Sequence, residues 1–256
     1  MAEGPQVLLR TEWLRSWIGG KVAHLVESKR DDLTHQCRHA TGRRIESVTC
    51  YGKHIFIDFG EDLVLHNHLL MKGRWRKYSG GFLFPPEQAW LVLDVGTSVV
   101  CNLEGQMLKW TDRSGRESVK ASLGPDTLAH PYPRDEITAR VRTSTLPISE
   151  ALLDQSLVAG IGNIAKSEIL YTAGLDPSRA ASILTDGDWD RLHDRIQKIL
   201  WESYDLGGRW IHRVYRKRGE PCPTCGAPIQ MTRVAPSYRS TYHCPSCQGE
   251  APLTLF

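Results

Sequence analysis

The sequence predicts a multidomain α+β protein with three parts: an N-terminal helix plus a two-layer β-sandwich, a helical domain and a C-terminal four-cysteine zinc finger. Three observations predict this fold class. Short strand-like segments fill the first half of the chain, apolar residues at helical spacing follow residue 125, and two Cys-x2-Cys pairs lie near the end. We place the domains at residues 1–124, 125–218 and 219–256, where the pattern changes.

The N-terminal part combines one helix with many short strands. Apolar residues at steps of three and four predict a helix over residues 7–18, which Gly19-Gly20 ends. Short apolar or alternating segments follow, separated by Gly, Asp and Asn: 22–26, 45–49, 54–59, 63–69, 90–95 and 98–103. The regular spacing of these turn residues predicts a β-sandwich that reaches about residue 123, with the first helix packed at its edge.

The second part is predicted to be helical. Apolar residues at helical spacing indicate helices over residues 135–141, 149–157, 164–173 and 189–204, and Ser149 is a plausible N-cap. Two of these helices are joined by Gly160-Ile-Gly-Asn163, whose glycines allow tight turns. The helix that follows begins with free backbone N–H groups, which suit an anion. From these residues alone, a plain helical hairpin with glycine turns is the alternative.

The strongest metal signal is the pair of knuckles Cys222-Pro-Thr-Cys225 and Cys244-Pro-Ser-Cys247. They are separated by eighteen residues, a spacing typical of a four-cysteine zinc site. Four thiolates around one structural Zn²⁺ would supply folding energy to a segment too small for a core. Two disulfides would need an oxidising compartment, and a redox Cys-x2-Cys normally stands alone, so we favour zinc.

The zinc-finger region is also the most basic part of the chain. Residues 206–248 carry seven Lys or Arg side chains against the single acid Glu220, a formal charge of +6, whereas the whole chain carries +3. Tyr215, Tyr238 and Tyr242 interleave with the basic residues. This pattern indicates a polyphosphate partner, and the alternative is a solvated basic face.

Composition is that of an ordinary globular protein of 256 residues, with 41% hydrophobic and 24% charged residues. The start, Met-Ala-Glu-Gly-Pro, lacks the features of a signal peptide, and no apolar run approaches a membrane span. We therefore expect a cytoplasmic protein that is not associated with membranes. Cys37, Cys50 and Cys101 are expected to be reduced, buried thiols.

Five segments, in the same order along the chain, together resemble the Fpg/Nei family of base-excision DNA glycosylases. They are Gly52-Lys-His54; His68-Leu-Leu-Met-Lys-Gly73; Leu123-Gly-Pro-Asp126; the stretch from Leu152 through Gly160-Ile-Gly-Asn163 to Ala173-Gly-Leu-Asp-Pro177; and the finger segments 214–229 and 239–248. The resemblance implies a helix–two-turn–helix in the second domain. It also implies a DNA glycosylase that flips a damaged base out of DNA and also acts as a lyase, and a monomer of bacterial type that associates with the nucleoid through DNA.

The resemblance implies roles for individual residues. The family uses its N-terminal amine, exposed after methionine removal, to attack C1′ and form a Schiff base; here this is the amine of Ala2. Glu3 matches the adjacent carboxylate that protonates the sugar or the base, and Lys53 matches the hairpin lysine that touches phosphate. Further matches are the phosphate clamps Asn163 and Arg239, the gap-filling Met71 and the phosphate-reaching His68. On residue type alone, Met71 is more often a core residue, and a buried histidine with satisfied hydrogen bonds is at least as good an interpretation of His68.

Two departures affect the chemistry. The usual second residue is proline, whose secondary amine gives a permanently charged iminium, whereas Ala2 gives an imine that must be protonated before elimination. Gln6 stands where many members carry glutamate. We therefore expect weaker or slower lyase activity. The alternative is a family relative that binds damaged DNA without catalysis, although such a protein has no use for Glu3 and Lys53. A zinc-ribbon RNA-binding protein would explain the tail but not the segment 160–163.

The substrate is less closely defined. The Asp-Pro-Arg-Arg-Phe-Gly motif of the 8-oxoguanine branch is only partly matched by Trp110-Thr-Asp-Arg-Ser-Gly115, which lacks the arginine–phenylalanine pair. The chain therefore resembles the Nei-like branch more closely. Without that pair the base opposite the lesion would go unread, which favours damaged DNA in single-stranded as well as duplex form. Oxidised, alkylated or crosslinked bases are the expected substrates.

Overall fold

The computed structural model describes residues 2–79, 87–105 and 107–249, which form two compact units. One unit comprises Met1–Ala2 and Gln6–Ser122, and the other comprises Glu3–Pro5 and Leu123–Phe256. The consecutive residues Ala2 and Glu3 thus belong to different units. The expected helical and finger domains fall within the same unit, and the division into three domains stays a prediction. Met1 and the expected tail beyond residue 249 lie outside the described residues.

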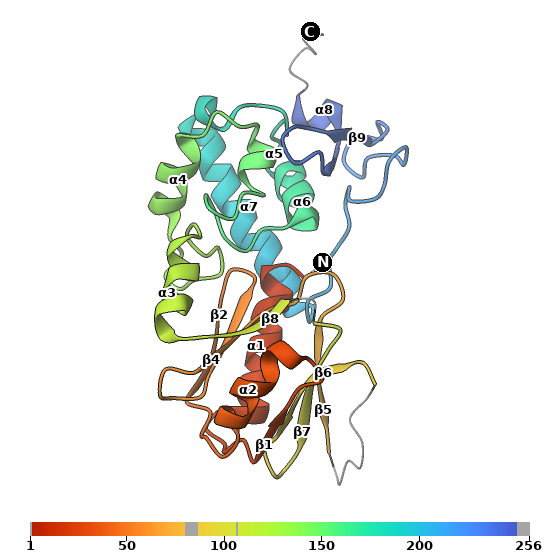
Figure 1. The fold of residues 1–256 in the computed structure, drawn as a ribbon. Helices are drawn as coiled ribbons and strands as arrows, with labels where there is room; N and C mark the ends of the chain where they lie inside the picture. The colour runs from red at the N-terminus through yellow and green to blue at the C-terminus, as the bar shows by residue number, and fades with distance from the viewer. Residues whose placement is uncertain (1, 80–86, 106, 250–256) are drawn as a thin grey trace. The chain divides into compact units, whose positions relative to one another are not determined.

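The first unit is a two-layer antiparallel β-sandwich (Figure 1). One sheet has the order β1-β6-β7-β5, formed by Leu25–Glu27, Ala89–Asp94, Val99–Leu103 and Arg74–Tyr78. The other has the order β2-β3-β4-β8, formed by Ser47–Tyr51, His54–Asp58, Val64–His68 and Met107–Thr111. Two stacked sheets were predicted from the short strands separated by turn residues, and this architecture is confirmed.

Alternating side chains of both sheets build one shared core. Ile55, Ile57 and Leu65 of the second sheet are fully buried in the same cluster as Leu91 and Leu93 of the first. A polar link also crosses between the layers. The indole Nε1 of Trp75 donates to Oδ1 of Asn67 at 3.0 Å, so a buried polar group has a partner inside the sandwich.

The predicted first helix is confirmed as α1, Gly4–Ile18, which starts three residues earlier than expected. Its Val7, Leu14 and Ile18 are fully buried in the sandwich core. Arg15 Nε donates to the carbonyl of Val48 at 3.1 Å, which attaches the helix to the edge strand β2. The helix thus packs at a sheet edge, as the sequence predicted.

The sandwich contains four elements that the sequence analysis did not predict: α2 (Asp31–Ala40), β5, β8 and α3 (Arg113–Ala121). The last predicted strand ended at residue 103, so β8 and the helix α3, with which this unit closes, were both missed. No residue of α3 is buried, so it has no apolar periodicity to detect. Its one clear signal is Asp112, whose side chain caps the helix by accepting from Gly115 N at 2.6 Å.

The second unit contains the predicted helices α4 (Arg134–Arg142), α6 (Asn163–Ala173) and α7 (Asp186–Asp205), with the one-turn 3-10 helix η1 (Ala181–Ile183) between the last two. A capping box starts α7, since Thr185 and Asp188 each accept from the other's backbone N–H. Helix α6 packs against α7 and is buried along most of its length.

The helix predicted over residues 149–157 is only the single turn α5, Ile148–Ala151, and Ser149 is not its N-cap. The cap position is Pro147, and Ser149 lies inside the turn, fully buried. Backbone carbonyls of a neighbouring loop accept the first N–H groups instead. Ile148 N donates to Arg179 O at 2.7 Å and Ser149 N donates to Pro177 O at 3.2 Å. Tertiary contacts therefore replace the expected cap.

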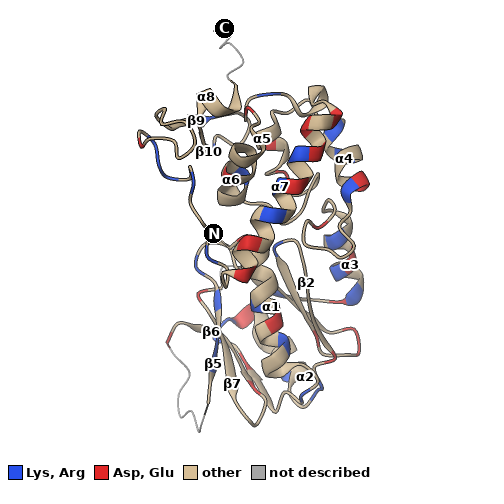
Figure 2. Ribbon diagram, turned by 180° about the vertical axis from the view of Figure 1, so that it is seen from behind, with Lys and Arg blue, Asp and Glu red and all other residues tan. Residues whose placement is uncertain are grey.

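The finger is a short hairpin, β9 (Gln230–Arg233) paired with β10 (Ser240–His243), followed by the single turn α8, Pro245–Gln248. Gln248 Nε2 donates to Leu175 O at 2.8 Å, so the finger is bonded to the loop after α6. Several Lys and Arg residues lie along the segment that leads from α7 to β9 (Figure 2). None of the described helices is long and apolar enough to cross a membrane.

Candidate active site and zinc centre

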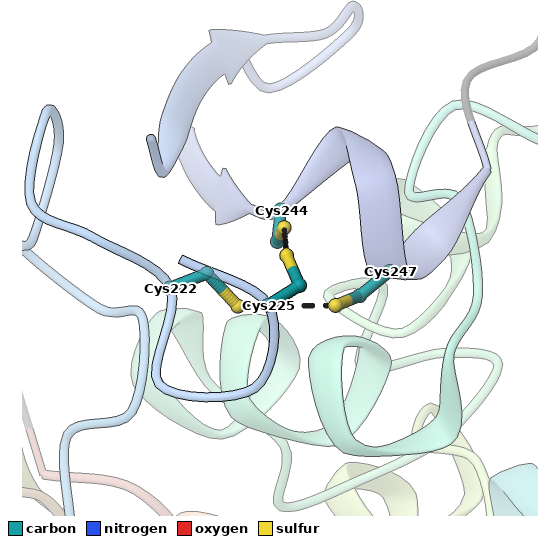
Figure 3. Close-up of side chains that lie close together, drawn as sticks. All are labelled: Cys222, Cys225, Cys244 and Cys247. Atoms are coloured by element: carbon teal, nitrogen blue, oxygen red, sulfur yellow. Dashed lines mark hydrogen bonds between the residues drawn. The ribbon is translucent and has the colours of Figure 1, made fainter. Parts of the chain in front are cut away.

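The four finger cysteines converge on one point (Figure 3). Their sulfur atoms all lie within 4.8 Å of one another, with Cys222 and Cys247 3.8 Å apart and Cys225 and Cys244 3.5 Å apart. A tetrahedral ion with Zn–S bonds of about 2.3 Å requires S···S distances of roughly 3.8 Å. The donor set and its spacing therefore fit one structural Zn²⁺, as predicted. None of these cysteines forms a disulfide.

The zinc centre is anchored on helix α6. The hydroxyl of Tyr171 lies 3.2 Å from Cys222 Sγ and 2.6 Å from Thr224 Oγ1, so it can share its hydrogen-bonding capacity between a thiolate and a neighbouring hydroxyl. Glu168, fully buried on the same helix, accepts from the backbone N–H groups of Val214 and Tyr215 at 3.1 and 2.9 Å. These contacts fix the start of the finger relative to α6.

The side chain of Glu3 caps the N-terminus of α6. Its Oε1 accepts from Ile164 N at 2.8 Å and its Oε2 accepts from Ala165 N at 3.0 Å. The cap residue Gly162 has no side chain to satisfy these donors. A helix N-terminus favours a negative charge, and the carboxylate is 1% exposed, so its orientation is fixed by the backbone of a distant helix.

Gly162 is required by the position of this carboxylate. A Cβ at residue 162 would lie 2.2 Å from Cδ of Glu3, far inside any real contact distance. The backbone of Gly162, with φ of −118°, is open to any residue, so only the space demands glycine. The glycines of segment 160–163 were predicted to make tight turns, and this one instead admits the Glu3 side chain.

Asn163 lies at the start of α6 and is bonded to the finger. Its Nδ2 donates to Ser240 O at 3.0 Å, and its Oδ1 accepts from Lys166 Nζ at 2.9 Å. Lys166 is fully buried and also donates to Thr241 Oγ1 at 2.8 Å. Burial lowers the pKa of Lys166 to about 8, with a further decrease from Arg239 and opposing increases from Glu150 and Glu3.

Arg239 is exposed on the finger next to Ser240, the residue to which Asn163 is bonded. The loop before it is held by Glu150 of α5, which accepts from Ser237 N at 2.9 Å and from Ser237 Oγ at 3.0 Å. Ser237 Oγ in turn accepts from Arg239 N at 3.2 Å. The second unit therefore brings together Glu3, Asn163 and Arg239 around the N-terminus of α6.

The first unit holds the other predicted residues. The nitrogen of Ala2 donates to the carbonyl of Leu70 at 3.1 Å, and Leu70 N donates to Nδ1 of His68 at 3.0 Å. Leu70 is a non-glycine residue with φ of +48°, in the left-handed region. Met71 follows it and is 67% exposed, so the alternative that Met71 is a core residue was wrong.

Lys53 and His68 belong to a cluster of cationic and imidazole side chains on the β2-β3-β4-β8 sheet. Lys53 lies in the two-residue turn between β2 and β3 and is 6% exposed, and its charge acts on His54 and His68. His54 Nδ1 lies 2.8 Å from His66 Nε2. Burial, and then His54 and Lys53, lower the pKa of His68 to about 4, so its imidazole is neutral at pH 7.

The comparisons with known proteins agree with this geometry. Residues 1–119 match the formamidopyrimidine-DNA glycosylase N-terminal domain, residues 123–214 match the H2TH domain of the same enzymes, and residues 219–249 match the zinc finger found in FPG and IleRS. A formamidopyrimidine-DNA glycosylase of Listeria innocua is 31% identical over 253 residues, 88% of each chain. One of Thermus thermophilus is 30% identical over 283 residues, 98% of this chain and 100% of the relative.

The chain belongs to the formamidopyrimidine-DNA glycosylase (Fpg/MutM) family. Solved members have the same fold. A MutM complex with DNA containing carbocyclic 8-oxo-G superimposes with a TM-score of 0.84 at 28% identity, covering 97% of this chain and 100% of that chain. The Lactococcus lactis Fpg bound non-covalently to DNA with an AP site gives 0.85 at 28% identity and the same coverage. These matches confirm the family and the fold without separating the Nei-like branch.

Several residues that shape the site were missed by sequence reasoning. Leu70 acts through its backbone and carries no sequence signal, and the partners of Asn163 come from strand β10, which lies far along the chain. Lys166 did carry a signal, since it is the only Lys or Arg in the helix sequence from Asn163 to Ala173. His54 and His66 were predicted only as strand residues. His66 lies two residues before His68 on β4, and His54 of β3 is paired with His68, so all three lie on the same face of the sheet.

Proposed function

We propose that this family member is a base-excision DNA glycosylase with AP lyase activity, and that the Ala2 amine is its nucleophile. The observation that carries the proposal is the arrangement of Ala2 and Glu3. Each of these consecutive residues is held by its own hydrogen bonds, Ala2 N to Leu70 O at 3.1 Å and Glu3 to Ile164 N and Ala165 N at 2.8 and 3.0 Å. A plain N-terminus would not need either contact.

In the proposed reaction the neutral amine attacks C1′ of a nucleotide flipped out of the stack. An α-amino group has an ordinary pKa of about 7.7–8.0, so part of it is a free base near neutral pH. Glu3 accepts the proton that the amine loses and passes it to the sugar ring oxygen or the departing base. The base leaves with the electron pair of the glycosidic bond. The nitrogen lone pair, freed by loss of one proton, then forms the second bond to C1′ while the bond from C1′ to the ring oxygen breaks and that oxygen takes up a proton, so a protonated imine joins Ala2 to C1′.

The remaining predicted residues are proposed to bind the DNA backbone. Lys53 and His68 would contact phosphate from the first unit, and Met71, with its exposed side chain, would fill the gap left by the flipped base. Asn163 retains one Nδ2 hydrogen beyond its bond to Ser240, and Arg239 is exposed, so both have donors left for phosphate. The Zn²⁺ supplies folding energy to the finger that carries Arg239.

The surroundings of Arg113 support our expectation that the base opposite the lesion goes unread. Arg113 Nη2 donates to Glu46 Oε2 at 2.7 Å and its Nε donates to Asp58 Oδ2 at 3.2 Å. Helix α3 begins directly after β8 here, so this segment has no protruding loop. An arginine held by two carboxylates is poorly placed to read a base. We therefore propose activity on oxidised, alkylated or crosslinked bases in single-stranded and duplex DNA, in the manner of the Nei-like branch.

The proposed partner is damaged DNA, bound by a monomer in a bacterial-type cytoplasm at the nucleoid. The solved relatives bind DNA with 8-oxo-G, FAPY-dG or an abasic site, which supports this partner. Phosphate contacts release counterions, so binding is expected to weaken with salt. Removing Arg239 should lower the slope of log K against log salt by roughly one contact.

The decisive experiment is borohydride trapping on DNA that carries an abasic site. A covalent adduct that disappears when Ala2 is acetylated or extended by a tag would support the enzyme. A panel of oxidised, alkylated and crosslinked bases, each in single-stranded and duplex DNA, then defines the substrate. Tight DNA binding with no adduct and no base release from any substrate would overturn the proposal in favour of a damage-binding protein.

A further inference from the structure

Leu70 joins the proposed nucleophile to an imidazole through its backbone alone. Its carbonyl accepts from Ala2 N at 3.1 Å, and its N–H donates to His68 Nδ1 at 3.0 Å. Its φ of +48° lies in the left-handed region, which is unfavourable for a residue with a Cβ. Strain of this kind persists only where the surroundings fix it, and here two hydrogen bonds do so.

We propose that the Leu70 carbonyl, held in place by His68, stabilises the protonated imine formed by the primary amine of Ala2. The inference rests on the proposed function and deepens it. Leu70 and His68 are positioning residues in this role, because they act through the nucleophile and not on the substrate. In this proposal, the turn at Leu70 compensates for the secondary amine that a proline would supply and that Ala2 lacks.

A primary amine keeps one N–H proton after it has formed the imine, and the Leu70 carbonyl can accept a hydrogen bond from it. A neutral Ala2 amine has two N–H bonds and a lone pair, and attack on C1′ converts the lone pair into the N–C1′ bond. One N–H proton then leaves to Glu3, and opening of the sugar ring gives an imine that retains the other N–H. That proton keeps the imine charged, which drives elimination. The Leu70 carbonyl is placed to accept it, because it already accepts the N–H of the Ala2 nitrogen in the unprocessed chain, where this nitrogen is a peptide nitrogen.

His68 fixes the direction of this carbonyl. Because its Nδ1 accepts from Leu70 N–H, a neutral His68 carries its proton on Nε2. Protonation at Nδ1 would remove the acceptor and release the turn. Burial and the charges of His54 and Lys53 lower the pKa of His68 to about 4, so the acceptor persists wherever the amine is a free base.

Two substitutions of His68 separate this role from direct phosphate binding. His68→Asn keeps an acceptor at the position of Nδ1 and removes the distal donor. His68→Gln removes the acceptor at that position and keeps a distal donor. Each is made with Ala2 and with Ala2→Pro, because an iminium formed by proline has no N–H to donate.

The measurement is strand cleavage under single-turnover conditions, with abasic-site DNA saturated by enzyme, beside the borohydride-trapped adduct. With Ala2, we expect His68→Gln to slow cleavage about tenfold, since a hydrogen bond to a charged group is lost, and His68→Asn, which keeps the acceptor but loses the distal donor, to slow it distinctly less than His68→Gln. In the Ala2→Pro background, His68→Gln should change cleavage by less than about twofold. Thermal unfolding of each variant shows whether it is folded.

Three results would overturn the inference: equal cleavage by wild type and His68→Gln, an equal loss in both backgrounds, or a loss in His68→Asn as large as in His68→Gln. If the variants fail to fold, a scalar coupling across the hydrogen bond between Leu70 N and His68 Nδ1 tests the geometry in the wild type, and its absence overturns the inference. An absent adduct with wild-type protein overturns the proposed function itself, and the inference with it.

Discussion

Ala2 and Glu3 are held in different ways, although they are neighbours in the chain. The sandwich unit holds Ala2 through the backbone of Leu70, within a large apolar core. The helical unit holds Glu3 through the N-terminus of α6, within a network of buried charged groups that includes Glu150, Lys166 and Glu168. Consecutive residues can therefore depend on unrelated stabilising forces.

The difference follows from how much apolar surface each region can bury. The sandwich core gathers side chains from two sheets and two helices, so backbone geometry at its rim is already fixed. The finger cluster has only five buried members, Tyr171, Val214, Cys222, Ile229 and Cys244, among the described residues. Such a small cluster needs a metal and hydrogen-bonded carboxylates to order it. The predictions below test this contrast.

The largest effect is expected from loss of zinc. Chelation, or the substitution Cys244→Ser, should remove about 10 kcal/mol or more of metal-binding free energy from the finger. We expect hydrogen exchange to become fast in residues 219–249 and DNA binding to be lost, while the sandwich strands stay protected. Metal analysis measures the bound zinc in parallel.

Cys50→Ala is the matched control, because it removes a thiol from the sandwich unit and should retain the zinc. Fast exchange throughout the sandwich after chelation would contradict the contrast between the two units. Full protection of the finger without metal would contradict the structural role of zinc.

The next largest effect is expected for Gly162→Ala. The added Cβ would lie 2.2 Å from Glu3 Cδ and should displace the carboxylate from the α6 N-terminus. Loss of a cap with two hydrogen bonds costs about 1–3 kcal/mol, and base excision should fall by at least tenfold because Glu3 leaves its position. Thermal unfolding and single-turnover excision measure the two effects.

Gly187→Ala in α7 serves as the control, since its nearest neighbours lie 3.9 Å or more from an added Cβ. We expect it to be neutral or to stabilise by about 0.5–1 kcal/mol, as alanine does in a helix. Equal stability and activity of Gly162→Ala and wild type would show that Glu3 does not depend on the cap.

A smaller effect is expected for Lys166→Met. The change leaves Asn163 Oδ1 and Thr241 Oγ1 without their buried donor and should cost about 1–3 kcal/mol, with weaker DNA binding. The folded pKa of about 8 lies below the ordinary 10.5, so the unfolded chain binds the extra proton between these values. Because of Lys166, the free energy of unfolding of the wild type should therefore rise with pH between about 8 and 10.5. This rise should be absent from Lys166→Met.

Lys198→Met, at an exposed position of α7, is the matched control and should change stability by less than about 0.5 kcal/mol. Denaturant unfolding at pH 7 and pH 9.5 gives both comparisons. A Lys166→Met protein as stable as wild type at pH 7, with unchanged DNA affinity, would show that the buried ammonium is dispensable.

The smallest effect at neutral pH concerns the histidines. Burial is the main cause that lowers the pKa of His54 to about 4, of His66 to about 3 and of His68 to about 4. The described part of the helical unit has one such group, His193, whose pKa is lowered to about 4. Unfolded histidines bind protons from about pH 6.5 downward, so stability is complete above this pH and falls below it. The slope is about 1.4 kcal/mol per pH unit for each histidine.

We therefore expect acid to weaken the sandwich unit more steeply than the helical unit, as measured by segment-resolved hydrogen exchange at pH 7, 5.5 and 4.5. His66→Phe should reduce the slope in the sandwich by roughly one proton. Equal loss of protection in both units, or an unchanged slope in His66→Phe, would contradict this assignment.

The sequence predicted the helices that bury apolar side chains, such as α1, α4, α6 and α7. It did not predict α3, whose residues are all at least partly exposed, or the short extent of α5. Both failures have one cause. Periodicity reports burial, whereas α3 depends on the Asp112 cap and α5 on carbonyls of the loop that contains Pro177 and Arg179.

The sequence by itself determined the family, the zinc ligands and the residues proposed for chemistry, because these depend on residue type and spacing along the chain. Only the tertiary structure decided what holds them. Glu3 is fixed by a helix that starts about 160 residues later, Lys166 by strand β10, and Ala2 by a carbonyl of Leu70. Backbone groups are the same in every residue, so their roles come from the fold and leave no trace in the sequence.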